Sequence, residues 1–267
     1  MPTAEQQTLI DGVLRLLETE PRVEAAWLAG SLGAGAGDAF SDVDVLVLAA
    51  DGTLPAVSAA LAERLSIVAK PVLVNTLFGG KVLSVVTEDW GRFDLSLIEG
   101  DELERHDARV LVALFNRSGR NPPVQPDQPY RANPEQLLKL VQEFFRILGL
   151  AVVVVGREEY ALALTGIDYL RRMTFDLMLE ENGVPPSRRG GALHRNPLLT
   201  ADQQQELVSV PPVAAERTSV IDGQRALAAI FLPRARKLAE EIGMVWPIEL
   251  EDATRRSLDA RLQPGML

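Results

Sequence analysis

The chain has 267 residues, of which 47% are hydrophobic, with no Cys, two His and a formal net charge of −10. This length and apolar fraction suffice to bury the core of one large domain or two ordinary ones, which excludes a disordered or low-complexity chain. The absence of Cys excludes a disulfide scaffold, thiolate chemistry and Cys-ligated zinc, and two His disfavour a His-rich metal centre. The acidic balance argues against long nucleic acid as a partner, because phosphates need basic residues.

The N-terminal residues include early acids and no basic segment followed by an apolar run, so no signal peptide is predicted. The longest apolar stretch, around residues 147–155, is too short to cross a bilayer. We therefore expect a soluble, cytoplasmic protein whose partners include neither a membrane nor a nucleic acid.

The first part of the chain mixes helical and strand-like patterns, which predicts a compact α+β sheet domain. Helical patterns cover residues 4–17 and 53–65. Residues 30–37 are so rich in Gly that we expect a loop there. Strand-like runs are found at residues 23–28, 42–48, 66–77, 81–87 and 92–98.

The second part is predicted to be a helical bundle, joined to the sheet domain by a Pro-rich linker. The domains expected are therefore residues 1–115, a linker at 116–133, and 134–267. Pro233 is expected to kink or break one of the helices. The predicted helices cover residues 134–155, 158–181, 201–210, 214–243 and 251–262.

The negative charge divides unequally between the two parts. Residues 1–130 contain 19 acids and 10 bases, whereas residues 131–267 contain 18 acids and 17 bases. The acidity therefore belongs almost wholly to the predicted sheet domain, which favours a site that needs a cation.

Asp42 and Asp44 are spaced two residues apart on a predicted strand, so both side chains should leave the same face while Val43 packs on the other. Two adjacent carboxylates repel one another unless a cation lies between them, and Mg²⁺ prefers oxygen ligands of this kind. Upstream, Gly30 and Ser31 could bring backbone N–H groups and a hydroxyl close to a phosphate. Asp94 is the one carboxylate in an otherwise apolar run, and could complete the metal site or accept a proton.

These residues resemble the motif of the nucleotidyltransferase superfamily, in which a Gly-Ser pair is followed by an Asp-x-Asp pair and later by a third Asp or Glu. Gly30-Ser31, Ser41-Asp42-Val43-Asp44 and Asp94 fit that pattern. With its helical second half, the whole chain is similar in length to the aminoglycoside and lincosamide adenylyltransferases, which are antibiotic-resistance enzymes.

The resemblance implies a role for each motif residue. Gly30 and Ser31 would hold the nucleotide phosphates, Asp42 and Asp44 would bind Mg²⁺, and Asp94 would be the third metal ligand or the general base. The implied reaction moves AMP from ATP to a hydroxyl of a small molecule, which is held by the helical domain. Relatives of this kind are often homodimers, so a homodimer is one alternative for the assembly.

Several alternatives remain open at this point. The base could instead be an acid of the helical half, namely Glu158, Glu159, Glu180 or Glu181. The acceptor could be a protein side chain, as in toxin–antitoxin nucleotidyltransferases, or the chain could bind nucleotide without turnover. Nucleic-acid polymerisation ranks last, because no basic stripe is present.

Other chemistry-bearing residues have simpler interpretations. The acids at 101–107 are interpreted as a solvated helix start, His194 as a surface or capping residue, and Arg171 and Arg172 as a charged outer face. The aromatic set at helical spacing is interpreted mainly as core packing. That set comprises Phe144, Phe145, Tyr160, Tyr169 and Phe175.

Overall fold

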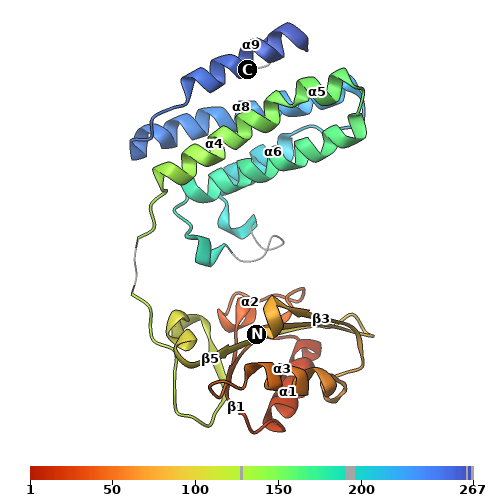
Figure 1. The fold of residues 1–267 in the computed structure, drawn as a ribbon, viewed down its shortest axis with the longest axis vertical. Coiled ribbons are helices and arrows are strands. Elements are labelled where there is room, and N and C mark those ends of the chain that lie inside the picture. Colours follow the sequence, from red (N-terminus) through yellow and green to blue (C-terminus); the bar gives the residue numbers. More distant parts are fainter. Residues whose placement is uncertain (127–128, 190–195, 263, 266–267) are drawn as a thin grey trace. The chain divides into compact units, whose positions relative to one another are not determined.

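The computed structural model divides into two compact units, Met1–Asp127 and Gln128–Leu267 (Figure 1). The structure describes residues 1–126, 129–189, 196–262 and 264–265. The first unit is a mixed β-sheet with flanking helices, and the described part of the second unit is helical, so the predicted α+β class is confirmed. In the described part of the chain, no helix is both long enough and apolar enough to cross a bilayer.

The first unit is organised around a six-stranded sheet in the order β3-β4-β5-β2-β1-β6. Neighbouring strands run antiparallel except β2 and β5, which are parallel. The strands are β1 (Val23–Leu28), β2 (Val43–Ala49), β3 (Pro71–Leu77), β4 (Val82–Thr87), β5 (Arg92–Glu99) and β6 (Val112–Asn116).

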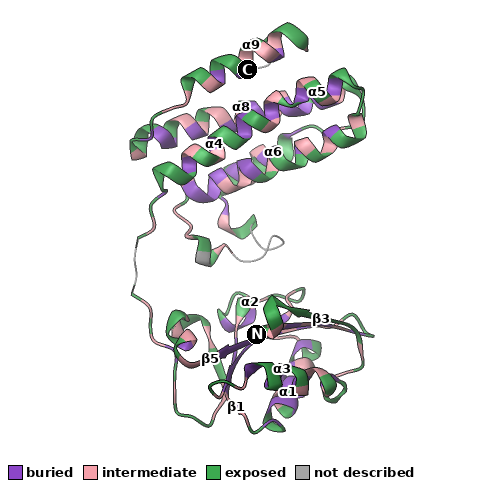
Figure 2. Cartoon of the chain, in the orientation of Figure 1, coloured by how far each residue is buried: buried purple, intermediate pink, exposed green. Residues whose placement is uncertain are grey.

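Two helices, α1 (Ala4–Glu18) and α3 (Leu54–Glu63), pack on one face of this sheet. The Thr3 side chain accepts a hydrogen bond from the Gln6 N–H, and the Gln6 side chain bonds back to Thr3, which forms a capping box that starts α1. The alternating burial along β4 and β5 puts every second residue into the core beneath these helices. Figure 2 shows both buried and exposed residues along α1 and α3. A smaller cluster around Trp27 and Leu46 is covered on the opposite face by the 3₁₀ helix η3 (Gly100–Arg105).

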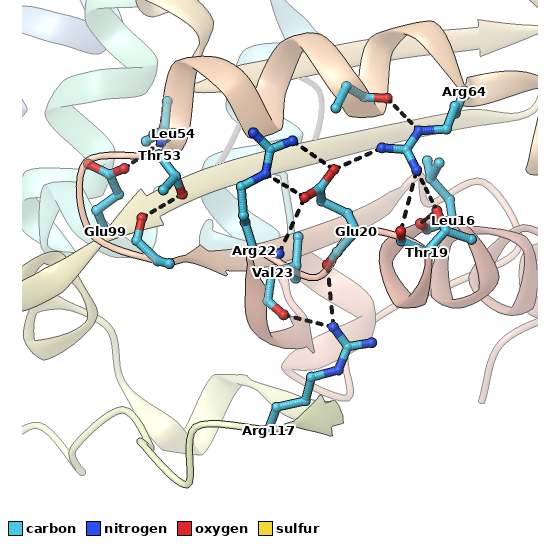
Figure 3. A network of polar contacts seen from close by, with 12 residues as sticks. Leu16, Thr19, Glu20, Arg22, Val23, Thr53, Leu54, Arg64, Glu99 and Arg117 are labelled. Atoms are coloured by element: carbon cyan, nitrogen blue, oxygen red, sulfur yellow. Dashed lines mark hydrogen bonds and ion pairs between the residues drawn. The ribbon is translucent and has the colours of Figure 1, made fainter.

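A buried carboxylate fixes the turn between α1 and β1. Glu20 forms ion pairs with Arg22 and with Arg64 at the end of α3, at 2.6 and 2.8 Å (Figure 3). Arg117, just after β6, donates to the backbone carbonyl of Val23 at 3.1 Å. The Glu20 carboxylate therefore connects the turn after α1 to α3, and Arg117 connects the segment after β6 to the same turn through backbone carbonyls.

The second unit has a helical core made of long apolar side chains. Phe144 stacks on Phe231 with ring centroids 3.7 Å apart, and Phe145 meets Trp246 edge-on. Asn133 caps the first helix of the unit by accepting from the N–H groups of residues 135 and 136. The helices are α4 (Pro134–Gly149), α5 (Ala151–Gly156), α6 (Tyr160–Glu181), α7 (Ala201–Ser209), α8 (Arg217–Ile242) and α9 (Ile248–Arg261).

Two expectations about helices need correction: that residues 134–155 form one helix, and that Pro233 could break one. The stretch 134–155 is not one helix, because the chain breaks at Leu150 between α4 and α5. Pro233 does not end α8, which continues to Ile242. Phe231 and Ala235, on either side of the proline, are fully buried, so packing of that helix face outweighs the lost N–H.

The Gly-rich stretch 30–37 was also misjudged, because it begins with a short helix, α2 (Gly30–Gly33). The Gly33 N–H donates to the Ala29 carbonyl at 2.8 Å, and Leu32 is buried, which together hold the turn in place. Strand β6 was not predicted at all, and the run 66–77 is a strand only from Pro71 onward, after the 3₁₀ turn η1 (Leu65–Ile67).

The segment 116–126 belongs to the first unit. Asn116 donates to the Arg120 carbonyl at 2.7 Å, and the Gln125 side chain donates to the Glu104 carbonyl at 2.7 Å. These hydrogen bonds hold the first part of the predicted linker against the sheet unit, and the two units divide between residues 127 and 128.

Candidate functional site

Two of the predicted site residues lie directly side by side in the sheet. In the parallel pair β2–β5, Asp44 is in register with Asp94, and their chain neighbours Val43 and Phe93 are also paired. Val43 and Phe93 are completely buried against the helices, so the two aspartates point to the opposite face. Asp42 immediately precedes β2, two residues before Asp44, and shares that side of the sheet.

The loop that leads to Asp42 is held by a buried amide. The Gln6 side chain on α1 donates to the backbone carbonyls of Asp38 and Ser41 at 2.7 and 2.8 Å. Arg92, at the start of β5, donates to the Phe40 carbonyl at 2.9 Å. Sequence reasoning missed both contacts, since neither residue stands in a recognisable motif and the partners are backbone atoms of a distant loop.

Gly30 lies against Asp44. Its φ of +57° suits glycine, and a Cβ built on it would collide with the Asp44 carboxylate. The adjacent Ala29 N–H donates to the Asp44 carbonyl at 2.8 Å, which fixes the two segments together. Ser31 follows in α2, whose first N–H groups have no carbonyl one turn earlier to accept them. Gly30, Ser31 and Asp44 therefore form one local arrangement.

The electrostatics of the three aspartates reflect their crowding. Burial, together with the charges of Asp42 and Asp94, raises the pKa of Asp44 to about 6, although Arg92 opposes this. Burial also raises the pKa of Asp94, against a hydrogen bond from Ser84 that lowers it. Ser84 faces Asp94 across the β4–β5 ladder, a contact that the sequence pattern alone could not locate.

The donor set suits a hard cation, but it is not a closed metal cage. Within the described residues, no ion pair to Lys or Arg involves Asp42, Asp44 or Asp94. In the same part of the chain, no three Asp, Glu, His or Cys side chains are arranged as a set that could hold a metal ion. Mg²⁺ is commonly bound by one or two carboxylates, with waters and substrate phosphates completing its shell, so an open pair fits this ion.

The four alternative base candidates lie in the helical unit. Glu180 accepts from Tyr130 and pairs with Arg189, while Glu181 pairs with Arg234 at 2.7 Å. Both carboxylates therefore have structural partners. Glu158 and Glu159 are exposed at the turn before α6.

The remaining sequence candidates have ordinary roles where they can be placed. Arg172 forms a surface ion pair with Asp168 one helical turn away, as expected of an outer face. The acids at 101–107 fall mostly in the 3₁₀ helix η3, where Glu102 pairs with Lys81. Phe144 and Phe145 are core residues, whereas Tyr169 is exposed. His194 lies outside the described residues.

No protein-family model matches the chain, and no curated protein matches its sequence. Among solved structures, the chain is similar to an aminoglycoside 6-adenyltransferase from Bacillus subtilis, with a TM-score of 0.45 and 19% sequence identity. The match covers 96% of this chain and 97% of that one.

Proposed function

We propose that the protein is a Mg²⁺-dependent nucleotidyltransferase that moves AMP from ATP to a hydroxyl of a small molecule. The observation that carries the proposal is the in-register pair Asp44 and Asp94, with Asp42 beside them on one sheet face, none of them in an ion pair within the described residues. Such a set is unfavourable in a purely structural role, because burial and mutual repulsion both oppose its charge. An aminoglycoside or a lincosamide is the acceptor class that the sequence motif suggests.

Each residue then has a chemical task. Asp42 and Asp44 would hold Mg²⁺, which supplies charge neutralisation and alignment of the triphosphate. Gly30 and Ser31 would lie against the phosphates, since the glycine leaves room for close approach. Asp94 would accept the proton of the acceptor hydroxyl.

The bond changes balance without a further reactant. The acceptor oxygen forms a bond to the α-phosphorus of ATP as the bond to the bridging oxygen breaks, and pyrophosphate leaves with that electron pair. The proton released by the hydroxyl goes to a carboxylate. Catalysis in this reaction is mostly positioning and electrostatic stabilisation, which the rigid parallel pair of strands is suited to provide.

The test is pyrophosphate release from ATP and Mg²⁺ across a panel of hydroxylated acceptors. We expect Asp42→Asn and Asp44→Asn to lower turnover at least about a thousandfold, because each removes a charge that acts on the transferring phosphoryl group. Glu135→Gln, on the exposed face of α4, is the matched control and should keep full activity. Persistent turnover in both aspartate variants would contradict the mechanism, and tight ATP binding with no product would favour a non-catalytic nucleotide-binding module.

A further inference from the structure

The polar row that contains Asp44 and Asp94 continues across the sheet. Ser84 on β4 is in register with Asp94, and Asn75 on β3 is in register with Ser84. Residues paired in this way point to the same face, so one polar residue from each of four neighbouring strands lies in a line. With strands about 4.8 Å apart, the row extends about 14 Å from Asp44 to the edge of the sheet.

Apolar residues flank the outer half of this row. On β3, Leu73 and Leu77 lie on either side of Asn75 and are 48% and 42% exposed. Their partners on β4 are Val86 and Val82, which are half-buried. The surface beside Asp94 is therefore a band of hydroxyl and amide groups between two apolar margins.

This edge of the sheet is guarded at its start by Pro71 and by a register shift between Pro71 and Leu73, but no charge guards the rest of the strand. β3 has the sequence PVLVNTL, with no charged residue, and six of its seven residues are exposed. Edge strands of soluble proteins are normally guarded by charges, bulges or a covering element, and contiguous exposed apolar surface commonly marks a binding site. Neither β3 nor β4 contains a charged residue, so a polycation lying along these two strands would find no acid to pair with until it reached Asp94 and Asp44 at the other end of the row.

Building on the proposed function, we infer that the β3–β4 face binds the acceptor, and that the acceptor is a hydroxylated molecule with an apolar side rather than a polycation. A hydroxyl placed over Ser84 lies next to Asp94, the group that would take its proton. Asn75 offers an amide for a second polar group, while Leu73 and Leu77 contact the apolar margins. We assign the acceptor to this face because the polar row continues directly from the aspartates at which the reaction would occur.

The chain contains no Cys, so single cysteines can report on this face directly. Asn75→Cys puts a thiol in the polar row, whereas Thr76→Cys is the matched control, since Thr76 is also exposed and its β4 partner Leu83 belongs to the other face. Labelling of each full-length variant by N-ethylmaleimide is followed without ATP or Mg²⁺. The probes are lincomycin, a hydroxylated sugar joined to an apolar ring amide, and kanamycin, a polycation.

Lincomycin at ten times its dissociation constant should slow labelling of the Asn75→Cys variant about tenfold, because protection scales with ligand occupancy. Thr76→Cys should be unaffected, and kanamycin should protect neither site. Adding Asp44→Asn should leave the protection intact while abolishing transfer, so acceptor binding and the proposed reaction can fail separately.

Several results would overturn the inference. If lincomycin gives no protection at millimolar concentration, or if kanamycin protects instead, the chemistry proposed for the acceptor is wrong. Equal protection of both cysteines that grows with protein concentration would identify a second copy of the chain as the occupant. Slow labelling of Asn75→Cys in the ligand-free protein would mean that another part of the chain covers it.

Discussion

Two acids, one in each unit, have pKa values that are shifted in opposite directions. In the helical unit, Glu251 has a side chain that is only 3% exposed, and it accepts hydrogen bonds from Arg236, Arg255 and Trp246. Burial alone would raise the pKa of Glu251, but these donors and the charge of Arg236 lower it instead. In the sheet unit, Asp44 has two like charges beside it, and its pKa rises to about 6.

The direction of the pKa shift separates acids that stabilise the fold from acids that are available to bind a ligand. Glu20, in the same unit as Asp44, belongs to the first kind, since hydrogen bonding from Arg22 lowers its pKa to about 2 against the effect of burial. For these three acids, the presence or absence of a guanidinium that hydrogen-bonds the carboxylate is therefore a better guide to function than burial or position in the chain.

The largest expected effect on stability is that of Glu251→Gln. The substitution leaves two guanidinium groups without their shared carboxylate, so we expect it to lower the free energy of unfolding by about 3 kcal/mol. This value is at the low end for a broken buried ion pair, because both arginines are partly exposed. Denaturant unfolding of the full chain measures this. A change no larger than that of Glu135→Gln would show that the cluster does not stabilise the fold.

Glu20→Gln should have the next largest effect and lower the free energy of unfolding by about 2 kcal/mol at neutral pH. This is less than the pKa shift of Glu20 alone would give, because Arg22 and Arg64 are partly exposed to solvent. Because the pKa of Glu20 is lowered in the folded state, its contribution is complete above about pH 4.5 and disappears as the pH falls towards about 2. Unfolding curves of the wild type and the variant should therefore converge in acid. A difference independent of pH would assign the effect to packing.

Asp44→Asn is expected to raise the free energy of unfolding, whereas the two glutamate variants lower it. Its pKa is raised from 3.8 to about 6, so the folded state binds more protons than the unfolded state between those values, and stability falls as the pH rises through that range. The variant should be more stable than the metal-free wild type near neutral pH, by about 1 kcal/mol after allowance for solvent exposure. The advantage should vanish below about pH 4, which thermal unfolding across pH can check.

The smallest effect is expected at the surface. Glu135 pairs with Lys139 one turn along α4, and both side chains are largely exposed. Glu135→Gln should leave the melting temperature unchanged within error, because exposed ion pairs of this type are strongly screened. A measurable loss would weaken the distinction between paired structural acids and solvated ones.

Sequence reasoning could identify the aspartates but not the sheet that joins them. Asp42 and Asp44 stand out because a two-residue spacing on a strand puts both on one face, and the apolar alternation of β5 isolates Asp94. Their pairing depends on a parallel contact between strands some fifty residues apart in the sequence, which only the fold specifies. The polar row through Ser84 and Asn75 depends on the same long-range registers.

The errors have local physical causes. Glycine content concealed α2, because the turn is held by Leu32 and by backbone hydrogen bonds rather than by helix propensity. Pro233 is tolerated in α8 because the neighbouring apolar residues are buried in the bundle. Strand β6 escaped notice because its apolar run lies next to the Pro-rich segment, which gains its order from contacts with the sheet unit.

The most direct test compares the stability of the wild type and Asp44→Asn with and without Mg²⁺ and ATP. Without ligands, the variant should be the more stable protein, since it lacks the unfavourable charge. With saturating Mg²⁺ and ATP, the wild type should gain stability by ligand binding and the variant should gain little, so the order of their melting temperatures should reverse. Equal stabilisation of both proteins, or a variant that is less stable in both conditions, would contradict the account.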